Sequence, residues 1–118
     1  MRSDEALYLD MLLACGKILR FTVGLSKADF EANELIQSAV LREIQVIGEA
    51  ARMVSDESKK THNNIEWRQI SGMRNRVIHE YFAIRLDIVW LAVTDDIPTL
   101  IDKLRDLIPS ESEIDDEE

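Results

Sequence analysis

The chain has 118 residues, of which 46% are hydrophobic and 31% are charged, and it contains a single cysteine. This length suits one compact domain, and one cysteine cannot close an internal disulfide, which excludes a disulfide-stapled secreted fold and zinc sites built on paired cysteines. No window reaches the roughly 18 apolar residues of a membrane span, so we expect an untargeted protein of the reducing cytoplasm that does not bind membranes.

The net charge of −9 argues against a protein that coats nucleic acid without selectivity. The acidity is concentrated at the C-terminus, where residues 110–118 hold six acids and no base. The rest of the chain carries 14 bases against 17 acids, and within it the stretch 59–85 has six bases and only two acids. An anionic ligand is therefore expected to bind in this basic stretch.

Apolar residues recur at spacings of three and four along most of the chain, which predicts an all-α fold. A first helix is predicted over residues 4–23. Its buried face is expected to carry Tyr8, Leu12, Cys15 and Leu19. Gly24 ends this helix, and Ser26 with Asp29 three residues later forms a capping-box pattern that opens the next segment.

A second helix is predicted over residues 32–55. Its inward positions are Ile36, Val40, Ile44, Ile47, Ala51 and Val54. Gly48 lies inside this helix, where glycine costs about 1 kcal/mol relative to alanine. We therefore expect a second helix to approach closely at Gly48. A polar linker, residues 56–64, is expected to follow.

The third predicted helix begins near Ile65, with Asn63 as its cap, and ends at Tyr81 or Phe82. Its expected inward residues include Trp67, which we assign to the core.

The fourth predicted helix opens at Asp87 as N-cap and continues to residue 107 with a seven-residue apolar repeat. Pro98 interrupts the repeat and predicts either a kink or a new helix capped by Asp95 or Asp96. Four amphipathic helices with short connections predict an up-and-down four-helix bundle over residues 1–109. The acidic tail, residues 110–118, is expected to be disordered.

The densest polar cluster of the chain lies on the third predicted helix. It comprises Arg74, Asn75, Arg76, His79, Glu80 and Tyr81. On a helix, Asn75 and His79 would stack one turn apart, and Arg74 and Tyr81 would fall within about 20° of each other. Such a patch can bind a phosphate, transfer a proton near neutral pH and hydrogen-bond an anion. The same pattern also fits a solvated helix face on which the arginines pair with nearby acids.

These residues resemble the motif of the HEPN superfamily, and within it the HepT-like toxins. The HEPN pattern has an Arg, a polar residue directly after it and a His four to six positions beyond the Arg. It falls here on Arg74, Asn75 and His79. HepT-like toxins are similar in having a Tyr two residues after the His, which is Tyr81 here. Residues 46–50, 65–75 and 87–90 also resemble that family, so that the likeness covers about residues 5–108.

The resemblance implies metal-independent RNA cleavage, without a cofactor, by a homodimer or a higher assembly whose two motifs meet in one composite cleft. His79 would act as base or acid, Arg74 would clamp the phosphate, and Asn75 would orient one of them. Arg76 is expected to support RNA binding. Glu49, near the helix crossing, either pairs with one of the arginines or is an exposed Glu.

The resemblance also implies a partner, because HepT-like toxins are modified with AMP at this tyrosine by their antitoxin, the nucleotidyltransferase MntA. Tyr81 is therefore the expected control point, since an added nucleotide phosphate would fill the cleft and neutralise Arg74. Two alternatives stay open. HEPN domains also occur as non-catalytic nucleotide-binding or scaffold partners of nucleotidyltransferases, which suits the acidity of the chain. An inert helical dimer, stabilised by the polar motif at its interface, is the third reading.

Overall fold

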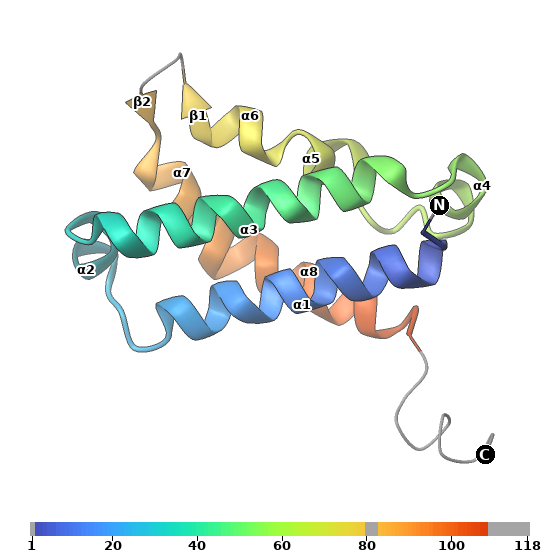
Figure 1. Cartoon of the computed structure of the whole chain (residues 1–118), viewed down its shortest axis with the longest axis horizontal. Helices are drawn as coiled ribbons and strands as arrows, with labels where there is room; N and C mark the ends of the chain where they lie inside the picture. Colours follow the sequence, from blue (N-terminus) through green and yellow to red (C-terminus); the bar gives the residue numbers. More distant parts are fainter. Residues whose placement is uncertain (1, 80–82, 109–118) are drawn as a thin grey trace.

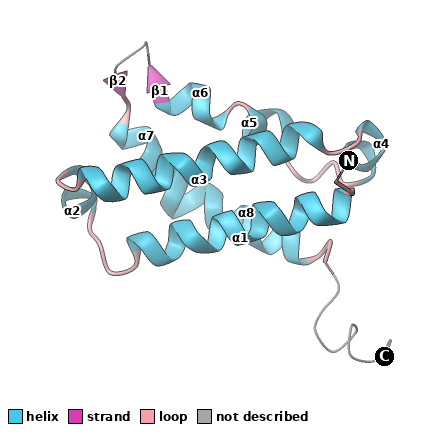
Figure 2. Cartoon of the chain, viewed as in Figure 1, coloured by secondary structure: helices cyan, strands magenta, loops and turns pink. Residues whose placement is uncertain are grey.

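The computed structural model describes residues 2–79 and 83–108. Helices make up most of this part of the chain, which confirms the all-α prediction (Figure 1, Figure 2). In chain order they are α1 (Asp4–Thr22), α2 (Lys27–Glu31), α3 (Glu34–Met53), α4 (Asp56–Thr61), α5 (Trp67–Ser71), α6 (Met73–Val77), α7 (Leu86–Leu91), the π-helix η1 (Ala92–Asp96) and α8 (Ile97–Arg105). Two short antiparallel strands, β1 (Ile78–His79) and β2 (Ala83–Ile84), lie between α6 and α7.

The bounds of α1 confirm the first predicted helix to within one residue. Ser3 caps it, because its Oγ accepts a hydrogen bond from the amide of Ala6 at 3.1 Å. The chain then turns at Gly24, whose φ of 76° is a left-handed conformation that favours glycine. The expected buried position of Leu19 is wrong: this side chain is 36% exposed, because the core contact is made by its neighbour Ile18.

The predicted capping box is present at the start of α2. Ser26 Oγ accepts a hydrogen bond from the amide of Asp29, and Asp29 Oδ2 accepts one from the amide of Ser26. This box opens a separate short helix and not the long helix expected from residue 32. The long helix α3 starts later because Asn33 adopts an extended conformation and caps it, its Oδ1 accepting from the amide of Ile36 at 3.0 Å.

Gly48 lies where α3 crosses α5, as its position in a helix predicted. A Cβ atom added at Gly48 would lie 3.2 Å from the carbonyl oxygen of Ser71 and 3.5 Å from that of Ile70. The glycine therefore allows the backbone of α5 to approach α3 directly. In Figure 1, α3 lies between α1 and the α5 and α6 segment.

The first two thirds of the expected polar linker form the helix α4 (Asp56–Thr61), so that prediction is wrong. Ser55 supplies the missing start signal, because its Oγ accepts from the amide of Ser58 at 3.2 Å. Acids fill the first turn and lysines the last, an order that complements the helix dipole. The carboxylate of Asp4 then binds both serines and fixes α4 against the start of α1.

The third predicted helix begins two residues late and is broken in two. Trp67 is its first residue, Glu66 occupies the N-cap position, and no side chain caps it, so Asn63 does not have the predicted role. Trp67 Nε1 instead donates to the carbonyl oxygen of His62 at 3.0 Å, which holds the start of α5 against the end of α4. Gly72 separates α5 from α6.

This segment also leaves the helical conformation at Val77, four or five residues before the predicted end. Ile78 pairs with Ile84 across the two short strands, and the amide of Arg85 donates to the carbonyl oxygen of Val77 at 2.7 Å. Two consecutive β-branched residues, followed by a tyrosine and a phenylalanine in the sequence, favour extended backbone over helix.

The break predicted at Pro98 is a new helix, α8, with Pro98 in its first turn. Proline has no amide hydrogen to donate, and its ring would clash with the carbonyl one turn earlier. The wider π-helical turn η1 accommodates it, with the amide of Ile97 donating to the carbonyl oxygen of Ala92. Asp96, one of the two predicted caps, occupies the N-cap position without a side-chain hydrogen bond.

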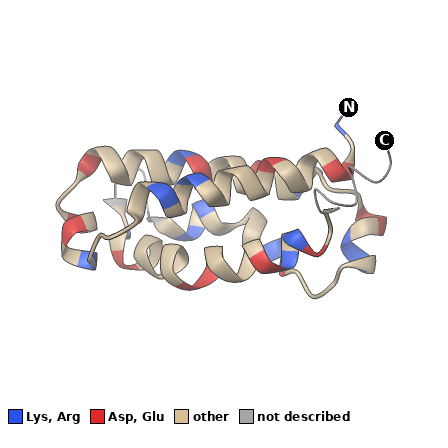
Figure 3. Cartoon of the chain, turned by 90° about the horizontal axis from the view of Figure 1, so that it is seen from below, with Lys and Arg blue, Asp and Glu red and all other residues tan. Residues whose placement is uncertain are grey.

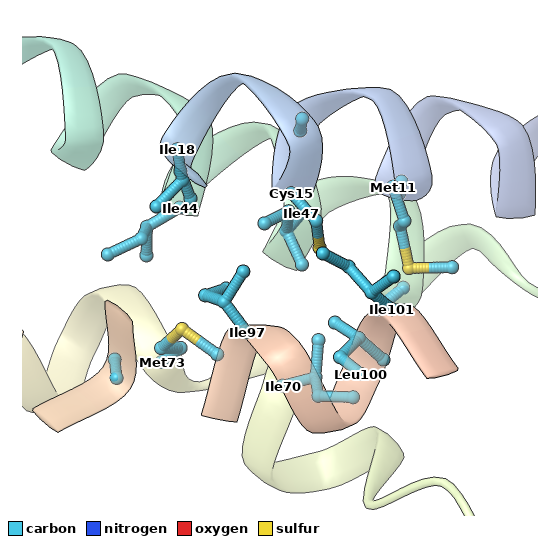
Figure 4. Packing of buried hydrophobic residues seen from close by; sticks show 14 of the residues in the cluster. Met11, Cys15, Ile18, Ile44, Ile47, Ile70, Met73, Ile97, Leu100 and Ile101 are labelled. Carbon is cyan, nitrogen blue, oxygen red and sulfur yellow. The ribbon is translucent and has the colours of Figure 1, made fainter. Parts of the chain in front are cut away.

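The long axis of the bundle is crossed by four helical segments in turn, which run alternately up and down. In chain order these segments are α1, α3, α5 with α6, and α7 with α8, and their arrangement confirms the predicted bundle (Figure 1). Figure 4 shows the core between them, with side chains of α1 and α3 packed against those of α8. The labelled members are Met11, Cys15, Ile18, Ile44, Ile47, Ile70, Met73, Ile97, Leu100 and Ile101. Among the helices the structure describes, none is both long and apolar enough to cross a membrane. The predicted acidic tail lies outside the described residues.

Candidate active site

A polar groove of about 190 Å³ runs between α3 and the α5 and α6 segment, beside the crossing at Gly48. Its lining residues are Gln45, Gly48, Glu49, Arg52, Ser71, Arg74 and Asn75. Arg74 and Asn75 are neighbours on α6 and both are exposed. Their guanidinium and amide groups provide hydrogen-bond donors that suit an anion. The structure thus brings two of the three expected catalytic residues into one groove.

Glu49 lies in the same groove and is exposed. Its Oε1 accepts a hydrogen bond from Gln45 Nε2 at 3.2 Å. Within the described part of the chain, no ion pair joins Glu49 to Arg74 or Arg76. The geometry therefore corresponds to the exposed alternative, with the carboxylate held by Gln45 in the groove that Arg74 lines.

Arg76 faces a different hollow, between the α5 and α6 segment and the η1 and α8 segment. It shares this hollow with Asp95 and Asp96 of η1 and Lys103 of α8, above an apolar floor that includes Met73. The two arginines of the motif thus line separate hollows, and the fold of the chain does not bring Arg76 into the groove of Asn75.

His79 lies on β1, with its backbone paired to Ala83. The continuous helix that was predicted to stack Asn75 and His79 one turn apart is wrong at His79, because α6 ends at Val77 and the chain is extended at His79. The position of the imidazole, and Tyr81 as a whole, lie outside what the structure describes, and so does the predicted alignment of Tyr81 with the arginine.

Arg85 braces the base of the short hairpin that carries His79. Its amide donates to Val77, and its guanidinium donates from Nε to Asp87 Oδ1 at 3.3 Å and from Nη2 to Oδ2 at 3.1 Å. The hydrogen bonds and the opposite charge lower the pKa of Asp87 and raise the pKa of Arg85. Asp87 lies in the first turn of α7, and the predicted N-cap role is wrong because its carboxylate is held by this bidentate pair.

The other polar or aromatic residues of note belong to the packing. Cys15 is fully buried, and burial raises the pKa of its thiol to about 12. Trp67 is buried, as expected for a core residue, and the partly buried Trp90 packs on Phe30 with ring centroids 5.4 Å apart. His62 is half-buried beside this core. Among the described residues, no three His, Cys, Asp or Glu side chains are grouped so that they could hold a metal ion.

Arg52 and Gln45 were not among the residues singled out from the sequence, although both line the groove. The spacing contains a signal for them, since Gln45, Glu49 and Arg52 recur at steps of four and three on the polar side of α3. That signal gains meaning only once the structure shows that this side of the helix faces Arg74.

The described segments that form the groove all lie within a region similar to known proteins. Residues 11–107 match the family described as ribonuclease HepT-like. A "Probable ribonuclease HepT" of Thermococcus cleftensis is 34% identical over 106 residues, which are 90% of this chain and 96% of that protein. A "Putative RNase" of Methanocaldococcus jannaschii is 31% identical over 84% of this chain and 91% of its own length. Another "Putative RNase", of Caldanaerobacter subterraneus, is 30% identical over 88% of this chain and 94% of its own length.

No solved structure gives a significant match. The matched region contains every lining residue of the groove and His79, and the chain belongs to the HepT-like family of the HEPN superfamily.

Proposed function

We propose that this protein is a metal-independent endoribonuclease, the toxin of a pair resembling HepT and MntA. The observation that carries the proposal is the groove in which exposed Arg74 and Asn75 lie together, directly before the strand of His79. Family membership supports the same activity, since the relatives named above are described as ribonucleases.

The chemistry needs no ion if three groups act on one phosphodiester. His79 takes the proton of a ribose 2′-hydroxyl, whose oxygen attacks the adjacent phosphorus, and the bond to the 5′-oxygen breaks as that oxygen gains a proton. The products are a 2′,3′-cyclic phosphate and a free 5′-hydroxyl. Arg74 binds the non-bridging oxygens and stabilises the charge that builds up on them, and Asn75 orients the phosphate.

The second proton transfer supports a composite site in a homodimer. One neutral histidine can accept the 2′-hydroxyl proton, but a second, protonated group must donate to the leaving oxygen. A two-fold axis that brings together two copies of the segment from Arg74 to His79 supplies both histidines. The same arrangement would let Arg76, which lines a separate hollow within one protomer, act beside the partner's groove.

We further propose that a nucleotidyltransferase antitoxin silences the site by attaching AMP to Tyr81. Tyr81 follows His79 by two residues, so that an added phosphate would compete with RNA for Arg74 and occlude the cleft. We expect Tyr81→Phe to keep full cleavage activity and to escape inhibition by the partner and ATP. Inhibition of Tyr81→Phe to the wild-type extent would show that the partner acts by masking and not by modification.

Cleavage of a defined single-stranded RNA and of tRNA in EDTA tests the nuclease. Arg74→Ala and His79→Ala are each expected to reduce the cleavage rate by about 100-fold or more. Arg20→Ala, which removes an exposed arginine from α1, and His62→Ala are the matched controls and are expected to cleave normally.

The ends of the product RNA complete this test, since a 2′,3′-cyclic phosphate is expected. Cleavage that survives both substitutions, or that requires an added metal ion, would contradict the proposed chemistry. Protein that is unmodified at Tyr81 and does not cleave RNA would instead favour the non-catalytic nucleotide-binding or scaffold partner of a nucleotidyltransferase, a role that suits the net charge of −9.

A further inference from the structure

The groove does not end at the motif residues but continues along α3 toward its C-terminal end. Gln45, Glu49 and Arg52 succeed one another on the side of α3 that faces Ser71 and Arg74. The glycine at the crossing brings the α5 backbone against α3, so these side chains stand along a shallow strip and are not buried between the helices.

Arg52 is the second cation of this groove and lies at its far end from Asn75 along the helix. The side chain is exposed, in the last turn of α3. Lys59 of α4 lies next to it, because Lys59 Nζ donates to the carbonyl oxygen of Arg52 at 3.3 Å. Lys59 and Lys60 line an open hollow together with Asp56 and Asn63. Figure 3 shows acidic and basic residues side by side at the end of the molecule where α4 lies, with Lys59 and Lys60 in the last turn of that helix.

We propose that Arg52 binds a phosphate of single-stranded RNA that neighbours the scissile phosphate held by Arg74. This inference rests on the proposed function and extends its site beyond the HEPN motif. An RNA strand carries one charge per nucleotide, so a strip with cations at both ends holds two phosphates and fixes the direction of the chain through the groove. Glu49 precedes Arg52 on α3 and lines the same groove, where its negative charge disfavours a third anion.

Arg52 is then a positioning residue that acts on substrate binding and not on proton transfer. Arg52→Ala is expected to raise KM for a short RNA about 5- to 10-fold, with kcat and the pH profile unchanged. Arg74→Ala, in contrast, is expected to lower kcat. Arg52→Lys keeps the charge and is expected to recover most of the affinity.

The direct test measures binding of a fluorescent single-stranded RNA to His79→Ala protein over a range of salt concentrations. Adding Arg52→Ala is expected to weaken binding 5- to 10-fold and to reduce the slope of log K against log salt by about 0.7, the value for one phosphate contact on a single strand. Arg20→Ala removes the same charge from α1, on the far side of α3, and is expected to leave the slope unchanged (Figure 1).

The outcomes separate this inference from the function on which it rests. If wild-type protein cleaves RNA and Arg52→Ala binds RNA with the slope of Arg20→Ala, Arg52 makes no phosphate contact and this inference alone is overturned. If wild-type protein neither binds nor cleaves RNA, both fail together. A cation in the last turn also stabilises a helix through its dipole; an Arg52→Ala protein with a lowered melting temperature but an unchanged slope would reveal that purely structural role and overturn the inference.

Discussion

Asp4 is the residue that ties two distant helix starts together. Its Oδ1 accepts from the amide of Ser55 at 3.0 Å, and its Oδ2 accepts from the hydroxyls of Ser55 at 2.6 Å and Ser58 at 2.5 Å. These hydrogen bonds, with a smaller contribution from the charge of Lys59, hold the pKa of Asp4 below its usual value of 3.8. The carboxylate therefore stabilises the fold in its charged form.

We predict that Asp4→Asn lowers stability by about 1 kcal/mol at pH 7, because an amide replaces the charged acceptor of three hydrogen bonds. A depressed pKa in the folded state contributes stability that is present above the unfolded pKa and lost as the pH falls through the folded value. The difference in melting temperature between wild type and Asp4→Asn should therefore shrink as the pH falls below 3.8 and the carboxylate becomes protonated in the folded state. Asp102→Asn, an exposed acid on α8, is the control. A difference that persists at acid pH would contradict the role of the charge.

At the scale of single residues, the sequence identified residues of the candidate site more successfully than it predicted which other residues lie beside them. The family motif identified Arg74 and Asn75, which the structure places in one groove. The sequence could not show that Arg52 shares that groove, since the two arginines are 22 positions apart and only the crossing at Gly48 brings their helices together. The role of Asp4 depends in the same way on a partner 51 positions away.

At the scale of elements, we predict opposite effects on stability when alanine replaces the glycine inside α1 and the glycine inside α3. Alanine at Gly48 would press its Cβ against the carbonyl oxygens of Ser71 and Ile70, which belong to a helix backbone and cannot rotate away. We expect Gly48→Ala to destabilise the protein by about 1 kcal/mol despite the higher helix propensity of alanine. Because the same displacement moves α6, cleavage should fall as well.

Gly16→Ala is the matched control for this change. Its added Cβ would meet only the flexible end of Arg20, at 3.5 Å. The gain in helix propensity is therefore expected to raise stability by about 0.5 to 1 kcal/mol. Thermal unfolding of both variants, followed by circular dichroism, makes the comparison. Equal melting temperatures would contradict the close approach of α3 and α5.

In the elements that were predicted wrongly, the local signals either competed or were too weak. The first helix was predicted to within one residue because its apolar stripe and the stop at Gly24 agree. In the third helix, the apolar spacing continues past Val77 while the β-branched and aromatic residues favour extended backbone, and the hairpin forms. The helix α4 is too polar to show an apolar stripe, and it depends on the cap by Ser55 and the contact with Asp4.

At the scale of the whole molecule, the net charge is negative and therefore repels the proposed RNA substrate. Residues 110–118 hold six of the 23 acids, and their removal changes the formal net charge from −9 to −3. Long-range repulsion of RNA should then fall. We predict that deletion of this segment raises RNA affinity about 2- to 10-fold at low salt, with the gain lost at high salt as the charges are screened.

This prediction is measured by RNA binding of His79→Ala protein with and without residues 110–118. A variant in which the six acids of the segment become glutamine and asparagine keeps the length of the chain and should behave like the deletion. Affinity that is unchanged at every salt concentration would show that the acidic segment has no influence on RNA binding.

The burial of Cys15 has a practical consequence for work on the groove. It is the single thiol of the chain, it has no exposed surface, and its pKa is raised to about 12. A thiol reagent can reach it only when the bundle opens, so that the rate of its modification reports the opening equilibrium of the whole core. A cysteine introduced on the surface, at Arg52 for example, would then be the one thiol that reacts under native conditions. Spin labels and fluorophores can therefore be attached in the groove of the natural sequence without first removing the native cysteine.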